Sequence, residues 1–178
     1  DTTHFPRTIT IDFGETNCEA PNGRMKRGKI IVMLSAPRWQ VGAQKTVTFE
    51  NYYVEDYHIE GTKTFTFNGK NEEGHPSITS ALTGGVITTP DGEQISREAT
   101  HTREMIAGQS TRKRWDDEFL LTGSAQGVNS NGKAYTMEIT TPLHTKAVCR
   151  WITEGVKEME VGENNIVLDY GDGSCDNV

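Results

Sequence analysis

Residues 46–54 read TVTFENYYV, and the alternation in this stretch decides the fold class. Val47, Phe49 and Tyr53 are expected on one side of an extended strand, and the residues between them on the other side. Period-two alternation places one face on a core and the other in water, which is typical of an antiparallel sheet. The segment 64–67, TFTF, alternates in the same way.

Asn-Gly and Asp-Gly pairs punctuate the chain between such stretches. Both residues of these pairs tolerate a positive φ, so each pair predicts a hairpin turn. The pairs are Asn22-Gly23, Asn68-Gly69, Asp91-Gly92 and Asn131-Gly132. The strands predicted between and around them cover residues 7–13, 28–36, 44–54, 57–67, 77–88, 94–106, 117–126, 133–141, 146–155 and 165–170.

The sequence therefore predicts an all-β fold, an antiparallel meander of about ten strands. A twisted extended sheet, a sandwich and a barrel remain open as its final form. No stretch shows apolar residues at helical spacing, and no Pro- or Ser-rich linker divides the chain, so residues 1–178 are expected to form a single all-β domain.

Composition narrows the function classes. The chain has 178 residues, 34% of them hydrophobic, and a net charge of −7. The negative charge argues against binding to nucleic acid or to anionic lipid. No apolar run approaches the ~20 residues that a membrane-spanning helix needs. The chain begins without Met or a signal-like segment, so we expect both ends to be cut from a longer precursor.

Two segments near opposite ends share a skeleton: residues 11–18 (IDFGETNC) and residues 168–175 (LDYGDGSC). We interpret them as a repeated strand–turn unit that ends in a cysteine. Cys149 lies on a predicted strand whose hairpin return brings residues 168 and 169 beside it, so the expected disulfide joins Cys149 and Cys175. By the same reasoning the partner of Cys18 lies ahead of residue 1, which leaves Cys18 unpaired in this chain. The alternative is three free thiols of a cytosolic protein.

Nine segments together resemble a group of secreted lipoproteins of Bacteroidetes-type bacteria that are anchored in the outer membrane and have no assigned activity. The resemblance spans nearly the whole chain and implies a location on the cell surface, with a lipidated cysteine outside this chain. It carries no catalytic residue. The segments are 6–14 (PRTITIDFG), Cys18, 22–24 (NGR), 27–32 (RGKIIV), 49–54 (FENYYV), 60–64 (EGTKT), 121–125 (LTGSA), 149–152 (CRWI) and 168–173 (LDYGDG).

Aromatic residues give the main indication of binding. Trp39 stands in an irregular loop, and Tyr52, Tyr53 and Tyr57 cluster at a hairpin connection, so these rings are candidates for a surface that stacks on sugars or anchors a protein partner. Ordinary packing within the sheet is the alternative. Trp151 is expected to pack on the disulfide, on the same strand face as Cys149.

Charged residues suggest a second surface. Arg97, His101 and Arg103 share one face of a predicted strand, where they would bind an acidic glycan or, as the alternative, pair with Glu or Asp across the sheet.

Acidic residues suggest metal or hydrolytic chemistry. Asp169, Asp172 and Asp176 lie on a Gly-rich turn and offer oxygen ligands to Ca²⁺, with a turn stabilised by Asx hydrogen bonds as the alternative. The five histidines are scattered, without the spacing of a metal site. The run 115–118 (WDDE) bunches carboxylates, as a glycosidase would require, but a solvated, partly paired loop is the favoured interpretation.

From the sequence we expect a non-catalytic module of the bacterial outer envelope, with a structural or protein-interaction role and no cofactor beyond Ca²⁺. Its partner would be an outer-membrane protein or a glycan, and the membrane would be reached only through a lipid anchor outside this chain. The alternatives are a carbohydrate-binding lipoprotein of a nutrient-uptake system and, third, a glycan hydrolase.

Overall fold

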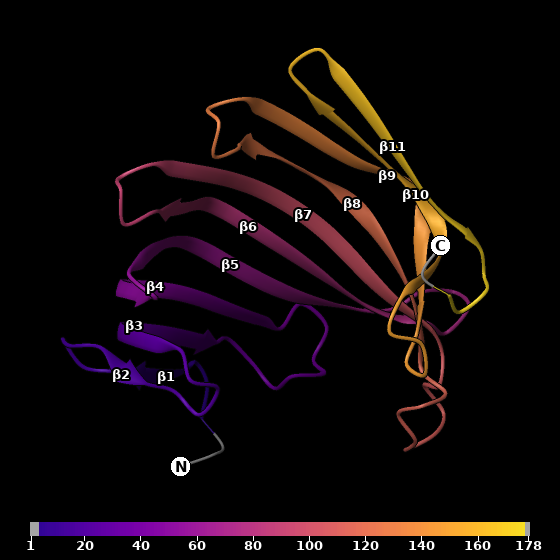
Figure 1. Cartoon of the computed structure of the whole chain (residues 1–178). Helices are drawn as coiled ribbons and strands as arrows, with labels where there is room; N and C mark the ends of the chain where they lie inside the picture. Colours follow the sequence, from indigo (N-terminus) through magenta and orange to yellow (C-terminus); the bar gives the residue numbers. More distant parts are fainter. Residues whose placement is uncertain (1–3, 177–178) are drawn as a thin grey trace.

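The computed structural model describes residues 4–176, and within that range the chain forms strands and turns without a helix. All strands belong to one antiparallel sheet, which is twisted and curved but does not close into a barrel (Figure 1). The prediction of an all-β meander is confirmed, and the extended sheet is the form that it takes. The strands are β1 (Arg7–Asp12), β2 (Cys18–Glu19), β3 (Met25–Leu34), β4 (Gln44–Val54), β5 (Tyr57–Lys70), β6 (Pro76–Thr88), β7 (Gln94–Ala107), β8 (Glu118–Val128), β9 (Ala134–Lys146), β10 (Ile152–Val161) and β11 (Asn164–Asp172).

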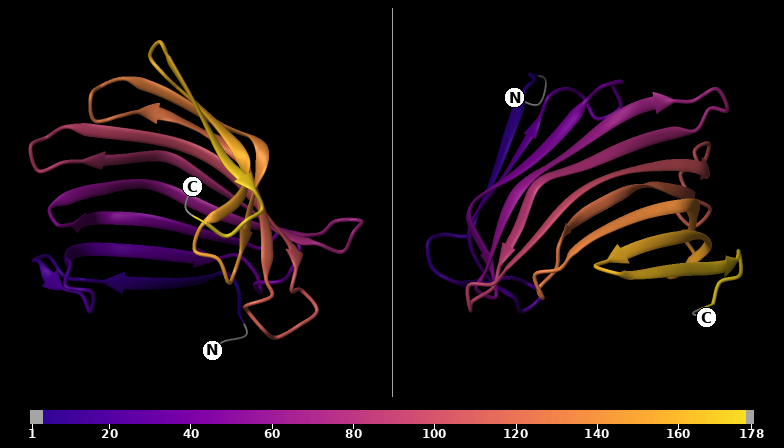
Figure 2. Two further views of the ribbon diagram at one scale, coloured as in Figure 1. Left: turned by 45° about the vertical axis from the view of Figure 1, so that its right-hand side comes forward. Right: turned by 90° about the horizontal axis from the view of Figure 1, so that it is seen from above.

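Strand order follows chain order from β1 and β3 to β11, and the short β2 pairs with β3 beside β1. Both views in Figure 2 show the same single layer, with β1 and β11 at its two edges. Sequential hairpins give this order because each tight turn returns the chain next to the strand that it has just left.

Three of the four predicted hairpin turns are present, at Asn22-Gly23, Asp91-Gly92 and Asn131-Gly132. The prediction at Asn68-Gly69 is wrong, because both residues lie inside β5, where the register with β6 shifts between Phe67 and Gly69. Gly69 uses its φ of 87° in this bulge. The chain turns instead at residues 71–74, where the Gly74 N–H donates to the Asn71 carbonyl at 3.0 Å.

The two faces of the sheet differ in chemistry. One face carries threonines in rows: Thr66, Thr79, Thr102 and Thr122 stand opposite one another across β5 to β8. The Thr79 and Thr102 hydroxyls are hydrogen-bonded at 2.9 Å. We call this the threonine face. Because side chains alternate along a strand, the residues directly before and after each of these threonines belong to the opposite face.

The core lies on that opposite face, over β8, β9 and β10. Leu143, only 3% exposed, packs with Ala125, Met137 and Ile139. Partly buried apolar side chains from the neighbouring strands complete the cluster, among them Met159. Full burial of one such aliphatic side chain contributes roughly 1.5–3 kcal/mol, and four of the buried apolar residues lie in this one cluster.

A bulge in β4 overturns the expected alternation around Asn51. Asn51 has a φ of 45°, and the pairing of β3 with β4 shifts between Arg27 and Lys29. Gly28 allows this close approach, since a Cβ there would lie 1.9 Å from the Asn51 carbonyl oxygen. The extra residue moves Tyr52 to the side of Phe49, and the two rings stack at 5.4 Å. Tyr52, not Tyr53, is therefore the buried ring, and burial raises its pKa.

The disulfide between Cys149 and Cys175 is present, as predicted. The strand predicted over residues 146–155 is wrong, however, because β9 continues to Lys146 and β10 begins at Ile152. Cys149 lies in the turn between them, where its N–H donates to the Lys146 carbonyl at 2.9 Å. Trp151 is consequently exposed rather than packed as a core residue, and Arg150 lies over its ring at 4.7 Å.

The repeated skeleton has the same local structure at both edges of the sheet. The Asp12 carboxylate accepts the Gly14 N–H at 2.8 Å, and the Asp169 carboxylate accepts the Gly171 N–H at 3.0 Å. Each aspartate thus stabilises a glycine with positive φ at the end of an edge strand. Cys18 is a free, exposed thiol.

Among residues 4–176 we find no helix with the length and apolar character needed to cross a membrane.

Candidate ligand-binding face

The face opposite the threonines carries a group of cationic side chains over β4, β5 and β7. Lys45 and Lys63 lie on the same face as Arg97, His101 and Arg103. On the neighbouring strands Lys45 stands opposite Phe65, Phe65 opposite Ser80, and Ser80 opposite His101. Lys63 pairs through Leu82 with Ala99, between Arg97 and His101. We call this surface the cationic face. The predicted placement of Arg97, His101 and Arg103 on one face is thus what the register shows.

These cations contact aromatic rings. The Lys45 ammonium lies 4.0 Å from the centre of the Phe65 ring, and the Arg103 guanidinium lies 3.5 Å from the centre of the Phe119 ring. Such cation–π contacts contribute about 0.5–1 kcal/mol at exposed sites. They hold the charged groups flat on the sheet, where a ligand can reach them.

Cross-strand pairing with carboxylates, the alternative for this face, does not occur. Within residues 4–176 neither Arg97 nor Arg103 forms an ion pair, and Arg97 donates instead to the Tyr135 hydroxyl at 3.3 Å. The reason is the register: Ser80 and Gly123 stand opposite His101, and Ile78 and Leu121 stand opposite Arg103. The glutamates of neighbouring strands fall on the threonine face.

The position of His101 on this face changes its pKa. Its pKa is lowered by partial burial and by the nearby charges of Arg97 and Lys63. Gly123 permits the close strand approach beside it, since a Cβ there would lie 2.1 Å from the Thr100 carbonyl oxygen. The neutral form of the imidazole is therefore favoured more here than in water. A bound anion would favour the protonated form and so oppose this shift of the pKa.

One end of the cationic face is hollowed. A hollow of about 740 Å³ lies between the β3–β4 loop, the starts of β6 and β8, and the β7–β8 loop. Trp39, 61% exposed, stands in its wall. Its ring is nearly perpendicular to the Phe67 ring, with 5.3 Å between the ring centres, and the Arg38 guanidinium lies 4.4 Å from its centre. Arg103 and Phe119 line the same hollow, and the loop adds three cations, Arg112, Lys113 and Arg114.

A second hollow, of about 610 Å³, adjoins the first and shares Arg38, Phe67 and Ile78 with it. It extends toward β1 along Lys45 and Phe65. The two hollows together form one trough of rings and cations, and we call it the cationic trough.

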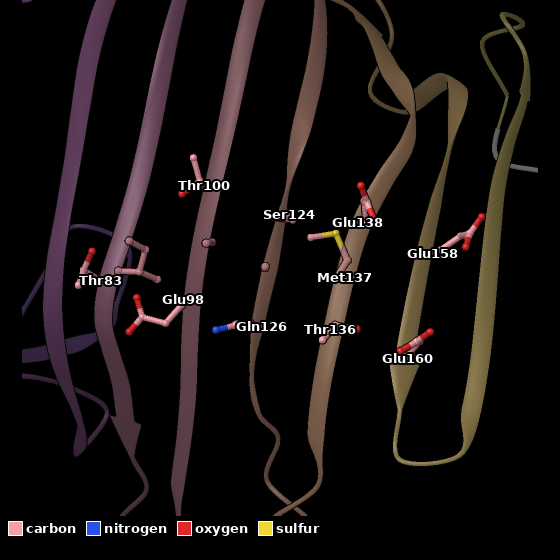
Figure 3. A pocket seen from close by; sticks show the side chains of 13 residues that line it. Thr83, Glu98, Thr100, Ser124, Gln126, Thr136, Met137, Glu138, Glu158 and Glu160 are labelled. Atoms are coloured by element: carbon pink, nitrogen blue, oxygen red, sulfur yellow. The ribbon is translucent and has the colours of Figure 1, made fainter.

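The threonine face carries the opposite charge. A hollow of about 500 Å³ on this face is lined by Glu98, Glu138, Glu158 and Glu160 together with Thr100 and Ser124 (Figure 3). Glu138 and Glu158 stand directly opposite each other on β9 and β10, an arrangement of like charges that is unfavourable. Charge is therefore separated between the faces, and an anionic ligand is attracted to only one of them.

The aromatic residues singled out in the sequence do not form one surface. Trp39 precedes β4, whereas Tyr52, Tyr53 and Tyr57 lie at the other end of that strand. Tyr53 lies between the Arg27 guanidinium, at 3.8 Å, and the His58 ring, at 4.5 Å. Asp56 is ion-paired with Arg27, and hydrogen bonds from Arg27 and Asn17 lower its pKa. Apart from the exposed ring of Tyr57, this cluster is occupied by its own contacts.

The aspartates proposed for Ca²⁺ act locally. Asp169 accepts from the Gly171 N–H, and Asp172 accepts from both the N–H and the hydroxyl of Ser174, which lowers the Asp172 pKa. The carboxylates of Asp169, Asp172 and Asp176 do not converge within 4.8 Å of one another. Ca²⁺ at this turn stays a prediction from the sequence.

The carboxylates of residues 115–118 are divided among separate contacts. Asp116 accepts from the Thr111 hydroxyl at 3.0 Å, Asp117 lines the cationic trough, and Glu118 contacts His144 at 2.8 Å. The three carboxylates thus have different neighbours, and the paired acids of a glycosidase stay a prediction from the sequence.

Comparison of the chain with known protein families, with curated proteins and with solved structures gives no match.

Proposed function

We propose that this chain is a non-catalytic β module of the bacterial cell envelope that binds an acidic glycan in the cationic trough. The observation that carries the proposal is a set of cations that have no carboxylate partner within residues 4–176, next to the exposed ring of Trp39 and open to solvent. Of the alternatives drawn from the sequence, carbohydrate binding is the one that this geometry supports best.

The chemistry of the trough suits this ligand class. The C–H faces of a sugar ring pack on flat aromatic side chains, and Arg forms paired, charge-assisted hydrogen bonds with a carboxylate. A uronic acid residue offers both groups at once. A trough longer than one sugar, from Trp39 toward Lys45 and Phe65, suits an oligosaccharide rather than a monosaccharide.

A location outside the cytoplasm is part of the proposal. The Cys149–Cys175 disulfide supports it, since stable disulfides are rare in reducing compartments. Attachment to the outer membrane through a lipid on a cysteine outside this chain follows only from the resemblance to envelope lipoproteins.

Calorimetric titration with an oligogalacturonate, and with a neutral glucan of the same length, tests the proposal. We expect the acidic oligomer alone to bind, with an affinity that falls as salt is raised. Trp39→Ala and Arg103→Gln should each weaken binding about tenfold, which corresponds to about 1.4 kcal/mol.

Trp151→Ala is the matched control, because Arg150 lies over Trp151 much as Arg38 lies over Trp39, but Trp151 does not line the trough. Equal losses in the two tryptophan variants, or no binding of any acidic oligomer, would overturn the proposal.

A second function, docking of an outer-membrane protein, is favoured by a different observation. Apolar side chains are exposed on both edge strands: Ile9 and Ile11 on β1, and Ile166 and Leu168 on β11. Co-purification of a membrane partner that is lost in Leu168→Lys, without affinity for glycans, would support this second function over the first.

A further inference from the structure

We propose that Glu73, His75 and Glu104 form a binding site for Zn²⁺. The three residues meet where the β5–β6 turn lies against β7, and their ligand atoms are all within 4.8 Å of one another. This site is separate from the cationic trough and independent of the proposed function.

The geometry centres on one nitrogen atom. The His75 Nδ1 atom lies 2.9 Å from a Glu104 oxygen and 3.4 Å from a Glu73 oxygen. Zinc bonds of about 2.0–2.2 Å in a tetrahedron place neighbouring ligand atoms roughly 3.3–3.5 Å apart. Small side-chain movements would therefore suffice to bind the ion, and the exposed Glu73 is free to make them.

The turn places these groups with a second layer of hydrogen bonds. The Asn71 side-chain oxygen accepts the N–H groups of Glu73 and His75, at 3.1 and 2.9 Å. Its nitrogen donates to the Glu104 oxygen at 3.0 Å. One amide thus fixes the turn and one carboxylate ligand together, which is the role that outer-layer residues play around bound metals.

The charge balance also favours a cation. Within residues 4–176 neither Glu73 nor Glu104 forms an ion pair with Lys or Arg, so the imidazole is the only basic side chain in contact with either carboxylate. An imidazole with two carboxylates is a donor set that suits zinc and leaves a fourth position for water. The ring nitrogen must be unprotonated to bind the metal.

The other histidine–carboxylate contacts show why this cluster differs. His144 has Glu118 at its Nε2 atom, at 2.8 Å, and Glu154 at its Nδ1 atom, at 3.8 Å, so its two carboxylates lie at different ring nitrogens. His58 has a single carboxylate, Glu60, at 3.5 Å. Only around His75, among the residues that the structure describes, do two carboxylates approach the same ring nitrogen.

The test uses the metal-stripped chain without a histidine tag. Zn²⁺ titration followed by calorimetry, and Co²⁺ titration followed by visible absorption, should each show one bound ion per chain. His75→Gln and Glu104→Gln should weaken Zn²⁺ binding at least tenfold. Asn71→Ala should weaken it about tenfold or more, as loss of an outer-layer partner typically does.

His58→Gln is the matched control and should bind Zn²⁺ like the parent chain. Glu73→Gln keeps the proposal testable if other variants unfold, because this side chain is 75% exposed and its replacement leaves packing intact. Absence of one-to-one Zn²⁺ binding in the parent chain, or equal affinities in His75→Gln and His58→Gln, would overturn the proposal.

Discussion

At the scale of single residues, cationic and acidic side chains occupy alternate positions along β7 and so lie on opposite faces of the sheet. Odd-numbered positions of β7 place Arg97, His101 and Arg103 on the cationic face, whereas even-numbered positions place Glu98 and Glu104 on the threonine face. Because the strand period is two, a shift of one residue would exchange the faces and mix the charges. The separation of charge is therefore a direct product of the register.

His101 makes this separation measurable. Its folded-state pKa lies below the usual 6.5, so the unfolded chain binds a proton more readily than the folded one as pH falls through that value. The free energy of unfolding should therefore decrease as pH falls below about 6.5. Urea unfolding between pH 7.5 and 5.5 measures this loss.

The variant His101→Gln should show a flatter profile over the same range, because the group responsible is gone. Identical profiles for the parent chain and the variant would mean that carboxylates, not His101, cause the loss.

The sequence predicted the placement of single residues correctly where the alternation of side chains along one strand was enough to determine it. The shared face of Arg97, His101 and Arg103 follows from their spacing within one strand. The absence of carboxylate partners for these three residues, within residues 4–176, cannot be predicted from that spacing, because it depends on which residues the two neighbouring strands place opposite them. The contact of His75 with Glu104 joins residues 29 positions apart, and spacing along the chain carries no signal for it.

At the scale of elements, residues typical of turns predicted most strand boundaries, and bulges caused the errors in β4 and β5. β4 begins and ends as the sequence predicts, at residues 44 and 54. Asn51, however, takes a positive φ inside that strand and reverses the sides of the residues after it. A bulge leaves little trace in sequence, because Asn-Gly pairs and isolated glycines serve both bulges and turns.

The disulfide joins two elements at the C-terminal end of the sheet, and its removal should be costly. It connects the β9–β10 turn to the segment after β11, and the two cysteines are 26 positions apart in the sequence. Loop-entropy estimates for such a link give about 3 kcal/mol. We expect Cys149→Ser with Cys175→Ser to lower the free energy of unfolding by roughly that amount in urea titrations.

Cys18→Ser, which removes the free thiol, is the control and should leave the midpoint unchanged. A loss of the same size in this control would show that the sulfur link is not the cause.

At the scale of the whole molecule, the sheet is one layer whose strands make extensive contact only with their hydrogen-bonded neighbours. No second layer covers either face within residues 4–176. The apolar cluster sits over β8 to β10, far from β1. Stability should therefore fall from the C-terminal half of the sheet toward the N-terminal edge.

Hydrogen exchange monitored by mass spectrometry tests this gradient. Amides of β8 and β9 should exchange slowest, and those of β1 and β3 should exchange fastest among the long strands. Reduction of the disulfide should speed exchange in β10 and β11 and leave β1 unchanged. Uniform protection across all strands would indicate that the sheet unfolds as a single unit.

The nearest-neighbour architecture has a consequence for how such a sheet changes length. Each hairpin depends on the strand before it and the strand after it, and on nothing across a core. Inserting or deleting a pair of strands near the middle would therefore lengthen or shorten the ribbon while the edge strands β1 and β11 keep their own pairing partners.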